Sequence, residues 1–318
     1  MADLAPYAST LAADAARVTE LAAIASWAQI GRGDEKHADQ LAVDAMRTAL
    51  NALDIDGKIV IGEGERDEAP MLYIGEKVGT GKGPAIDIAL DPLEGTTLTA
   101  KAMANALTVL SMSPGGGMLH APDTYMDKIA IGPGFAPGTV DLDMKPGDNV
   151  RSLASAKGVR PEDITVCVMD RPRHAELIAA LREVGAKVML ITDGDVAGVI
   201  HTAEPETGID LYLGSGGAPE GVLAASALKC VGGHFQGRLI FRNDEERARA
   251  NRTGVTDFDR KYDLHELVSK DAIFAATGVT KGAMLDGVQM KDGFVSTHTL
   301  VMDSSTRTVQ RIRTIRPV

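Results

Sequence analysis

The spacing of apolar residues along the chain predicts helices that alternate with strands. Apolar positions recur at helical spacing in 8–30 and again in 38–53. Apolar runs of strand length occur at 58–62, 86–90, 105–112, 126–131, 164–169, 187–191, 209–213, 236–241, 272–276 and 293–303. Further helices are predicted at 173–184 and 219–230. This succession is typical of an α/β fold with mixed sheets.

A stretch rich in glycine and proline between Gly132 and Gly147 interrupts this pattern. Because such residues break regular structure, we place a boundary there and predict two α/β subdomains, 1–145 and 146–318. The charged segment 243–263 mixes acids with arginines and is expected to form an exposed helix and loop. A chain of 318 residues is long enough to bury a sizeable core in this arrangement.

The composition of the chain argues against some classes of binding partner. The formal net charge of -11 argues against nucleic acid or an anionic membrane as the main partner. No apolar run approaches the roughly 20 residues that span a bilayer, and the first residues lack the apolar core of a leader peptide. Cys167 and Cys230 each stand in apolar surroundings, which is typical of buried thiols in a reducing compartment. We therefore expect a cytoplasmic protein.

The most informative motif is Asp91-Pro92-Leu93-Glu94-Gly95-Thr96-Thr97, directly after the apolar run 86–90. Pro92 cannot donate a ladder hydrogen bond and Gly95 allows a sharp bend, so the strand is expected to give way to a turn. Two carboxylates held three residues apart repel each other unless a cation lies between them. Hard divalent ions such as Mg²⁺ prefer such oxygen ligands. On this motif alone, an ordinary helix start with Glu94 near its N-terminus stays open.

Three further segments place acids at the ends of predicted elements. They are 31–39, with Asp39 at the start of a helix; 58–65, with Glu63 at the end of a strand; and 211–221, with Glu220 at a helix start. Each segment alone is compatible with a helix cap, a turn or an exposed face. Together they predict a site assembled from acids that are distant in sequence.

Two glycine-rich segments are candidate phosphate loops. Gly214 to Gly217 is predicted to be a loop between a strand and a helix, with Pro219 in the first helical turn. Its N–H groups could hold an anion, although a helix-start loop without a ligand is an alternative. This segment lacks the Gly-Lys-Ser/Thr ending of a P-loop, and Gly79 to Gly83 lacks the following helix of a Rossmann turn.

The motifs, in their order along the chain, resemble the class II fructose-1,6-bisphosphatases of the lithium-sensitive, inositol-monophosphatase-like superfamily. The segments that carry the resemblance are IGEGERDEAPMLYIGEKVG (61–79), DPLEGTT (91–97), APDTYM (121–126), DRPRH (170–174), TDGDVAG (192–198), GGAPEG (216–221) and ATGVTKG (276–282). The superfamily implies a layered αβαβα sandwich. It also implies that the N-terminal subdomain binds metal and the C-terminal subdomain binds the sugar phosphate.

The resemblance implies a metal centre with a proton-transfer group beside it. The ligands of Mg²⁺ or Mn²⁺ would be Asp39, Glu63, Asp91, Glu94 and Glu220. Thr96 would help to activate the nucleophilic water, with Asp39 or Glu63 accepting its proton. No histidine is required in this scheme, so His37, His174 and His201 are expected to be scaffold residues.

The resemblance also implies a binding site for a sugar bisphosphate. Its residues would be Glu94, Gly95, Thr96, Tyr125, Arg171, Pro172, Arg173, Asp193, Gly194, Asp195 and Gly217. Arg171 and Arg173 can offer planar forks to the non-reacting phosphate. Asp193 and Asp195 could accept hydrogen bonds from sugar hydroxyls, with a common Asp-Gly turn as the alternative. For Tyr125 the alternative is a partly buried aromatic residue.

The activity implied by the resemblance is hydrolysis of the 1-phosphate of fructose 1,6-bisphosphate, in gluconeogenesis or carbon fixation. A homo-oligomer, either a dimer or a tetramer, is implied as well. Sedoheptulose 1,7-bisphosphate stays open as a sole or second substrate because the two sugars share the reacting end. Inositol phosphate hydrolysis is disfavoured by the arginine pair. A non-catalytic sugar-phosphate-binding regulator would be expected to lack one of the acids, and none is missing.

One position departs from the family pattern. Many members carry a lysine directly after Gly-Arg-Gly-Asp, whereas this chain has Glu35 there, followed by Lys36. Either Lys36 supplies the cation from the next position or the local charge differs. The five metal carboxylates are unaffected.

Overall fold

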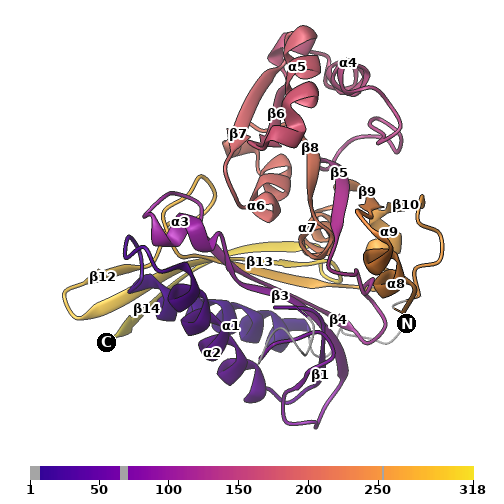
Figure 1. Ribbon diagram of the computed structural model, residues 1–318. Helices are drawn as coiled ribbons and strands as arrows, with labels where there is room; N and C mark the ends of the chain where they lie inside the picture. Colours follow the sequence, from indigo (N-terminus) through magenta and orange to yellow (C-terminus); the bar gives the residue numbers. More distant parts are fainter. Residues whose placement is uncertain (1–7, 65–70, 253) are drawn as a thin grey trace. The chain divides into compact units, whose positions relative to one another are not determined.

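The computed structural model describes residues 8–64, 71–252 and 254–318. Residues 65–70 of the motif at 61–79 lie outside the described residues. The described chain forms two compact units, one from Met1–His120 together with Val268–Val318 and the other from Ala121–Leu267. Each unit contains helices and one mixed sheet (Figure 1), which confirms the α/β class. The boundary predicted within 132–147 lies inside the second unit.

The described strands of the first unit form one sheet. They are β1 (Asp56–Ile61), β2 (Lys77–Val78), β3 (Ala85–Glu94), β4 (Leu107–Pro114), β11 (Ile273–Gly278), β12 (Gln289–Lys291), β13 (Phe294–Asp303) and β14 (Thr308–Pro317). Their order is β12-β13-β11-β4-β3-β1-β2, and β14 pairs with β13. The pair β1 and β3 is parallel and the other described pairs are antiparallel. The sheet therefore joins the N-terminal strands directly to the C-terminal ones.

Two amphipathic helices, α1 (Ala8–Trp27) and α2 (Glu35–Asn51), pack against this sheet (Figure 1). Their apolar faces bury side chains such as Val18 and Met46 with residues of β1 and β3. The sequence predicted both helices. The second begins earlier than predicted because the Asp34 side chain accepts a hydrogen bond from the His37 N–H at 3.0 Å and caps it. A short helix, α3 (Thr96–Ala100), follows β3.

The sequence did not predict strand β14, because its side chains do not alternate between apolar and polar. Thr314 and Arg316 of this strand bind the carboxylate of Glu20 on α1, with Thr314 Oγ1 at 2.5 Å from Glu20 Oε1. Glu20 is only 4% exposed. A carboxylate is stable at such a position only when it is hydrogen-bonded and neutralised, so these polar side chains replace the apolar contacts of an ordinary strand.

The second unit has its own mixed sheet and a larger share of helix. Its described strands are β5 (Tyr125–Ile131), β6 (Thr165–Met169), β7 (Lys187–Ile191), β8 (Leu211–Gly217), β9 (His234–Ile240) and β10 (Lys261–Asp263), in the order β10-β9-β5-β8-β6-β7. Its helices are α4 (Pro146–Lys157), α5 (Ala175–Glu183), α6 (Asp195–Ile200), α7 (Ala218–Val231), α8 (Asp244–Arg252) and α9 (Leu264–Leu267). Short 3-10 turns occupy Pro161–Asp163, Pro172–His174, His201–Ala203 and Pro205–Thr207. Strand β6 is parallel to β7 and β8, whereas β5 is antiparallel to β8 and β9.

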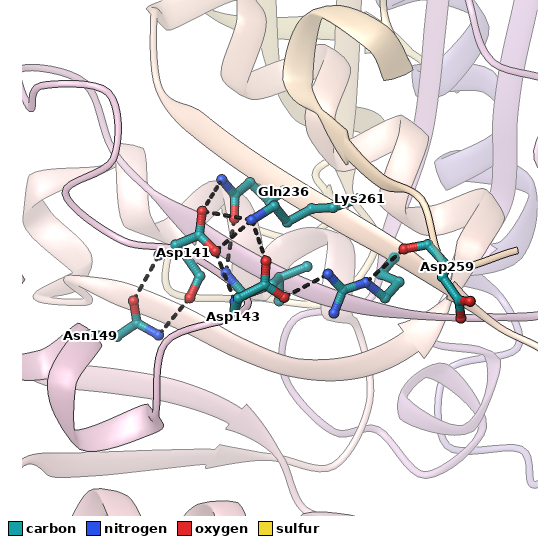
Figure 2. Close-up of polar contacts among 8 residues, drawn as sticks. Asp141, Asp143, Asn149, Gln236, Asp259 and Lys261 are labelled. Atoms are coloured by element: carbon teal, nitrogen blue, oxygen red, sulfur yellow. Dashed lines mark hydrogen bonds and ion pairs between the residues drawn. The ribbon is translucent and has the colours of Figure 1, made fainter. Parts of the chain in front are cut away.

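The glycine- and proline-rich stretch 132–147 is fastened to strands β9 and β10 by ionic contacts (Figure 2). Lys261 Nζ lies 2.6 Å from Asp141 Oδ1 and 2.7 Å from Asp143 Oδ2. Arg238 Nη2 donates to Asp143 Oδ1 at 2.6 Å. Hydrogen bonds from Lys261 and then from Arg238 lower the pKa of Asp143 to about 2. These contacts explain why the stretch belongs to the second unit despite its composition.

Both cysteines are buried, and neither is joined in a disulfide. Burial is the main reason that the pKa of Cys167 rises to about 12, so this thiol behaves as a small apolar core residue, as predicted. None of the helices in the described residues combines the length and apolar character needed to cross a membrane.

His201 should make the stability of the protein depend on pH. Burial lowers its pKa to about 4, so in the folded state it stays neutral well below the usual value of 6.5. As the pH falls below 6.5, the unfolded state binds the proton first and the free energy of unfolding decreases. Between pH 7 and pH 5 this contribution is roughly 2 kcal/mol.

Urea unfolding of the wild type and of His201→Asn at both pH values would measure this effect. The wild type should lose roughly 2 kcal/mol more than the variant. His265→Asn, at an exposed position, provides the control and should follow the wild type. Parallel pH profiles for the wild type and His201→Asn would contradict the prediction.

Candidate active site

Acidic residues of the first unit lie where strands β1 and β3 end. The two strands are parallel, and Ile61 of β1 is paired with Ala89 of β3. Glu63 therefore follows β1 at the level of Asp91 in β3. The carboxyl ends of parallel strands are a common place for ligands in α/β proteins.

Asp39 on α2 lies close to the same edge. Its pKa is raised to about 6, first by burial and then by the negative charge of Asp91. A second carboxylate has this effect only at short range, so α2 brings Asp39 near the end of β3. The segment before α2 is held there by a backbone hydrogen bond of 2.9 Å from the Gly31 N–H to the Thr99 carbonyl.

Strand β3 continues further through the aspartate-proline motif than predicted. It ends at Glu94, not near Asp91, but its pairing with β4 is irregular between these two residues. Pro92 lies in the irregularity, and the Leu93 N–H turns back to Asp91 Oδ1 at 3.0 Å. The predicted interruption of the ladder is thus present within the strand. Glu94 is 4% exposed at its end.

A glycine in the left-handed conformation begins a short helix in each unit. Gly95 has φ 89° and ψ 56° before Thr96 of α3, and Gly194 has φ 82° and ψ 56° before Asp195 of α6. Other residues adopt this conformation only at a cost, which explains the glycine in both motifs. The side chain after each glycine therefore lies in the first turn of a helix.

The donor chemistry of the acidic edge suits a hard divalent cation. Asp39, Glu63, Asp91 and Glu94 all offer carboxylate oxygens, the ligands that Mg²⁺ and similar ions prefer. The pKa of Asp39 is raised by burial and, to a smaller extent, by the negative charge of Asp91, which a cation would compensate. Within residues 8–64, 71–252 and 254–318, however, no three His, Cys, Asp or Glu side chains are arranged as a metal site. Glu220 lies in the other unit, in the first turn of α7.

Residues 214–217 form the end of strand β8, so the prediction of a glycine loop was wrong. A Cβ on Gly214 would lie 3.3 Å from the ring of His174. On Gly216 it would overlap Asp195 Oδ2, and on Gly217 it would overlap Glu220 Oε2. The strand is built of glycine because three polar side chains lie against its backbone. Pro219 does occupy the first turn of α7, as predicted.

His174 and Ser215 position the guanidinium of Arg173. The Ser215 N–H donates to His174 Nε2 at 2.9 Å, so Nδ1 carries the proton and donates to the Met169 carbonyl at 2.7 Å. Mainly because of burial, the pKa of His174 lies below its usual value, which agrees with this neutral tautomer. Arg173 Nε then donates to Ser215 Oγ at 3.0 Å, and its Nη2 donates to the Ser215 carbonyl at 2.8 Å. His174 is thus a scaffold residue, as predicted.

Tyr125, Arg171 and Arg173 lie in the second unit. The Cζ of Arg173 is 5.0 Å from the centroid of the Tyr125 ring, which is a cation–π contact. Arg171 Nη1 donates to the Asp170 carbonyl at 3.2 Å. Pro172 begins the 3-10 turn Pro172–His174, which contains Arg173, follows Arg171 and leads directly into α5. The structure therefore brings Tyr125 and Arg173 together.

Asp195 forms a buried ion pair that the sequence did not predict. Lys128 Nζ lies 2.5 Å from Asp195 Oδ2, and the two side chains are 1% and 8% exposed. The available signal was a lysine within the otherwise apolar second half of β5. One Asp195 oxygen is thus occupied by Lys128. Asp193 Oδ1 accepts the Gly194 N–H at 3.1 Å, which is the turn interaction considered as the alternative to sugar binding.

The remaining sequence predictions concern the departure from the family pattern at the start of α2 and two further histidines. Glu35 and Lys36 are exposed in the first turn of α2, and His37 is exposed beside them. His201 is buried and neutral, as expected of a scaffold residue.

Comparison with known proteins identifies the family. Residues 9–316 match the family described as bacterial fructose-1,6-bisphosphatase, glpX-encoded. The chain is 46% identical to "Fructose-1,6-bisphosphatase 1 class 2" of Escherichia coli (strain K12), over 96% of this chain and 94% of that protein. It is also 46% identical to "D-fructose 1,6-bisphosphatase class 2/sedoheptulose 1,7-bisphosphatase" of Synechococcus sp. (strain JA-3-3Ab), over 94% of this chain and 93% of that protein. The chain belongs to the glpX-encoded, class 2 fructose-1,6-bisphosphatases.

Gly216→Ala should destabilise the second unit. The added Cβ would overlap Asp195 and disturb its pair with Lys128, so we expect a loss of about 1–3 kcal/mol in the free energy of unfolding. Gly147→Ala in α4 is the control, because its Cβ would have its nearest contact at 3.5 Å and alanine favours a helix. Urea unfolding measures both variants. Equal stability of the two would contradict the role given to Gly216.

Proposed function

We propose that this protein removes the 1-phosphate of fructose 1,6-bisphosphate and releases fructose 6-phosphate and phosphate. The observation that carries the proposal is 46% identity, over nearly the whole chain, to class 2 fructose-1,6-bisphosphatases. The reaction would belong to gluconeogenesis or carbon fixation. None of the acids or arginines of the predicted site is missing, which disfavours a non-catalytic regulator.

Sedoheptulose 1,7-bisphosphate is the second candidate substrate. It is favoured by the name of the Synechococcus relative, which includes sedoheptulose 1,7-bisphosphatase. The two sugars share the reacting end, so one catalytic centre can serve both. Turnover of both substrates, measured side by side, ranks them.

The residues proposed to hold the metal are Asp39, Glu63, Asp91, Glu94 and Glu220. When bound, Mg²⁺ or Mn²⁺ would neutralise phosphoryl oxygens and lower the pKa of water. The carboxylate chemistry and the raised pKa of Asp39 support this assignment.

Thr96 is proposed as the residue that orients the attacking water. A hydroxyl group can activate water only if a nearby base accepts its proton, and we assign that role to Asp39 or Glu63. Thr96 lies in the first turn of α3, fixed by the left-handed Gly95. Glu94, Gly95 and Gly217 would contact the reacting end of the substrate.

The second unit is proposed to bind the rest of the substrate. Tyr125, Arg171 and Arg173, with Pro172 shaping their loop, would hold the non-reacting phosphate through guanidinium forks. Asp193 and Asp195, joined by Gly194, would accept hydrogen bonds from sugar hydroxyls. Burial of the Lys128–Asp195 pair supports a fixed orientation of that carboxylate.

Family membership also supports three broader proposals. We assign the chain a five-layer αβαβα sandwich and a homo-oligomeric state, either a dimer or a tetramer. A cytoplasmic location is proposed because both thiols are buried and outside any disulfide.

The catalytic proposal predicts strict metal dependence. Treatment with EDTA should abolish phosphate release from fructose 1,6-bisphosphate, and addition of Mg²⁺ or Mn²⁺ should restore it, because the acids would otherwise repel the substrate. Phosphate release is measured before chelation, after chelation and after each addition. Full activity in metal-free buffer would contradict the metal assignment. No release from either sugar bisphosphate under any condition would contradict the function.

Thr96→Ala should separate chemistry from binding. We expect kcat to fall by about 100- to 10,000-fold, the usual contribution of a positioned proton-transfer group, with a smaller change in KM. Thr97→Ala removes the neighbouring hydroxyl, to which we assign no role, and should leave kcat within a few-fold of the wild type. Steady-state kinetics measure both. An unchanged kcat in Thr96→Ala would remove this residue from the mechanism.

A further inference from the structure

The ring of Tyr125 has a second arginine beside it. The Cζ of Arg242 lies 5.0 Å from the ring centroid, the same distance as the Cζ of Arg173. Tyr125 is paired with Gly217 of β8 on one side and with Ile240 of β9 on the other. Arg173 is bound to β8 through Ser215, whereas Arg242 follows β9 in sequence. The two guanidinium groups therefore approach the tyrosine from opposite sides of β5.

Arg242 is fixed in place by a buried carboxylate. Its Nε donates to Glu246 Oε1 at 2.7 Å, its Nη2 lies 2.5 Å from the same oxygen, and its backbone N–H donates to Glu246 Oε2 at 2.7 Å. Glu246 is 2% exposed and also accepts a hydrogen bond from Thr124 Oγ1 at 3.1 Å. The Arg242 side chain itself is 58% exposed. One end of this guanidinium is thus anchored while the rest faces solvent.

Donors remain available around the ring. Arg173 and Arg242 each use Nε and Nη2 for the contacts above, and Nη1 of both has no partner among the described residues. Among the described residues, the ring of Tyr125 contacts the two arginines, and its hydroxyl donates to none of them. The guanidinium N–H groups on either side of the ring and the tyrosine hydroxyl are donors that suit the oxygen acceptors of a phosphate group.

The arrangement is unusual for two arginines. Like charges near one another are unfavourable, and the ring offsets only part of that cost through its negative faces. Glu246 compensates the charge of Arg242, whereas Arg173 is bound to the uncharged Ser215. An anion between the two would compensate the remaining charge.

We infer that Arg242 is a further binding residue for the non-reacting phosphate of the sugar bisphosphate, opposite Arg173 across Tyr125. This inference rests on the proposed function. It gives the phosphate two guanidinium groups from different elements of the second unit, a loop after β6 and the residues after β9. The site would then recognise the position of the phosphate as well as its charge. Substrates with a second phosphate at that position would therefore bind more tightly than monophosphates.

The alternative is that Arg242 only neutralises Glu246 and stabilises the start of α8. A structural role would affect all substrates equally. Binding of the second phosphate would affect only substrates that carry it. Fructose 1-phosphate has the same reacting end as fructose 1,6-bisphosphate but lacks the other phosphate, so the two substrates separate these roles.

The experiment compares Arg242→Ala, Arg242→Gln and Arg247→Ala on both substrates. Arg247 is an exposed arginine of α8 paired with Asp244 at 3.0 Å, outside the site, and provides the control. Arg242→Gln keeps a donor for Glu246 and carries the test if the alanine variant does not fold. Thermal unfolding identifies the folded variants.

For fructose 1,6-bisphosphate we expect KM to rise about 10-fold or more in both Arg242 variants, with kcat changed less than threefold. The kcat/KM for fructose 1-phosphate should change less than threefold, and inhibition by fructose 6-phosphate should weaken in parallel with the rise in KM. Equal losses on both substrates, or no change on either, would overturn the inference. A wild type that fails to hydrolyse fructose 1,6-bisphosphate would instead contradict the proposed function.

Discussion

The second unit depends on a lysine and an aspartate that are buried together. An amino group as deeply buried as that of Lys128 requires a hydrogen-bonding partner, and Asp195 provides a carboxylate oxygen at 2.5 Å. This contact imposes conditions on three other parts of the chain. Gly216 must lack a Cβ where the carboxylate crosses β8, and Gly194 must be left-handed where α6 begins. A Cβ on Gly221 would lie 2.6 Å from Met126 Sδ and 3.3 Å from Lys128 Cε, so the lysine stem contributes to the lack of space there. The glycines of 214–217, which were predicted from the sequence to form a loop, therefore leave space for polar side chains to pack against β8.

Most helices and strands could be predicted from the sequence because the spacing of apolar residues follows the buried face of each element. Helices α1, α2, α5 and α7 and most interior strands follow this rule. Several failures occur where polar groups replace apolar ones, although helix α4, directly after the glycine- and proline-rich stretch, was missed as well. Strand β14 is held by Thr314 and Arg316 on Glu20, and the GSGG strand is made of residues that seldom form strands. Lys128 was missed for the same reason, because a buried lysine depends on a partner that is distant in sequence. The proximity of Asp39 and Asp91 was recoverable from the motifs, whereas the surroundings of Tyr125 required coordinates.

The two units carry opposite kinds of chemistry. In the first, acids lie at the ends of β1 and β3, and the pKa of Asp39 is raised mainly by burial and then by the charge of Asp91. In the second, guanidinium groups are held by hydroxyl, carbonyl and carboxylate groups that fix them without filling all of their donors. A phosphate ester needs both kinds of group, since its reacting end must lose negative charge while its other end must be held. Residues of both units lie within the segment 9–316 that matches the family.

The first unit is made of two chain segments that are separated by the whole of the second unit, and this affects how it can fold during synthesis. Strand β4 has β11 as its neighbour, and β11 follows the whole of Ala121–Leu267 in the chain. While the polypeptide is being made, β4 emerges with one edge unpaired, and its residues are buried throughout in the finished protein. Unpaired apolar strand edges are the usual origin of aggregation in nascent chains. The second unit is continuous and can fold on the ribosome, whereas the first is completed by β14, which ends at Pro317. Its sheet can close only after β11 to β14 have been synthesised.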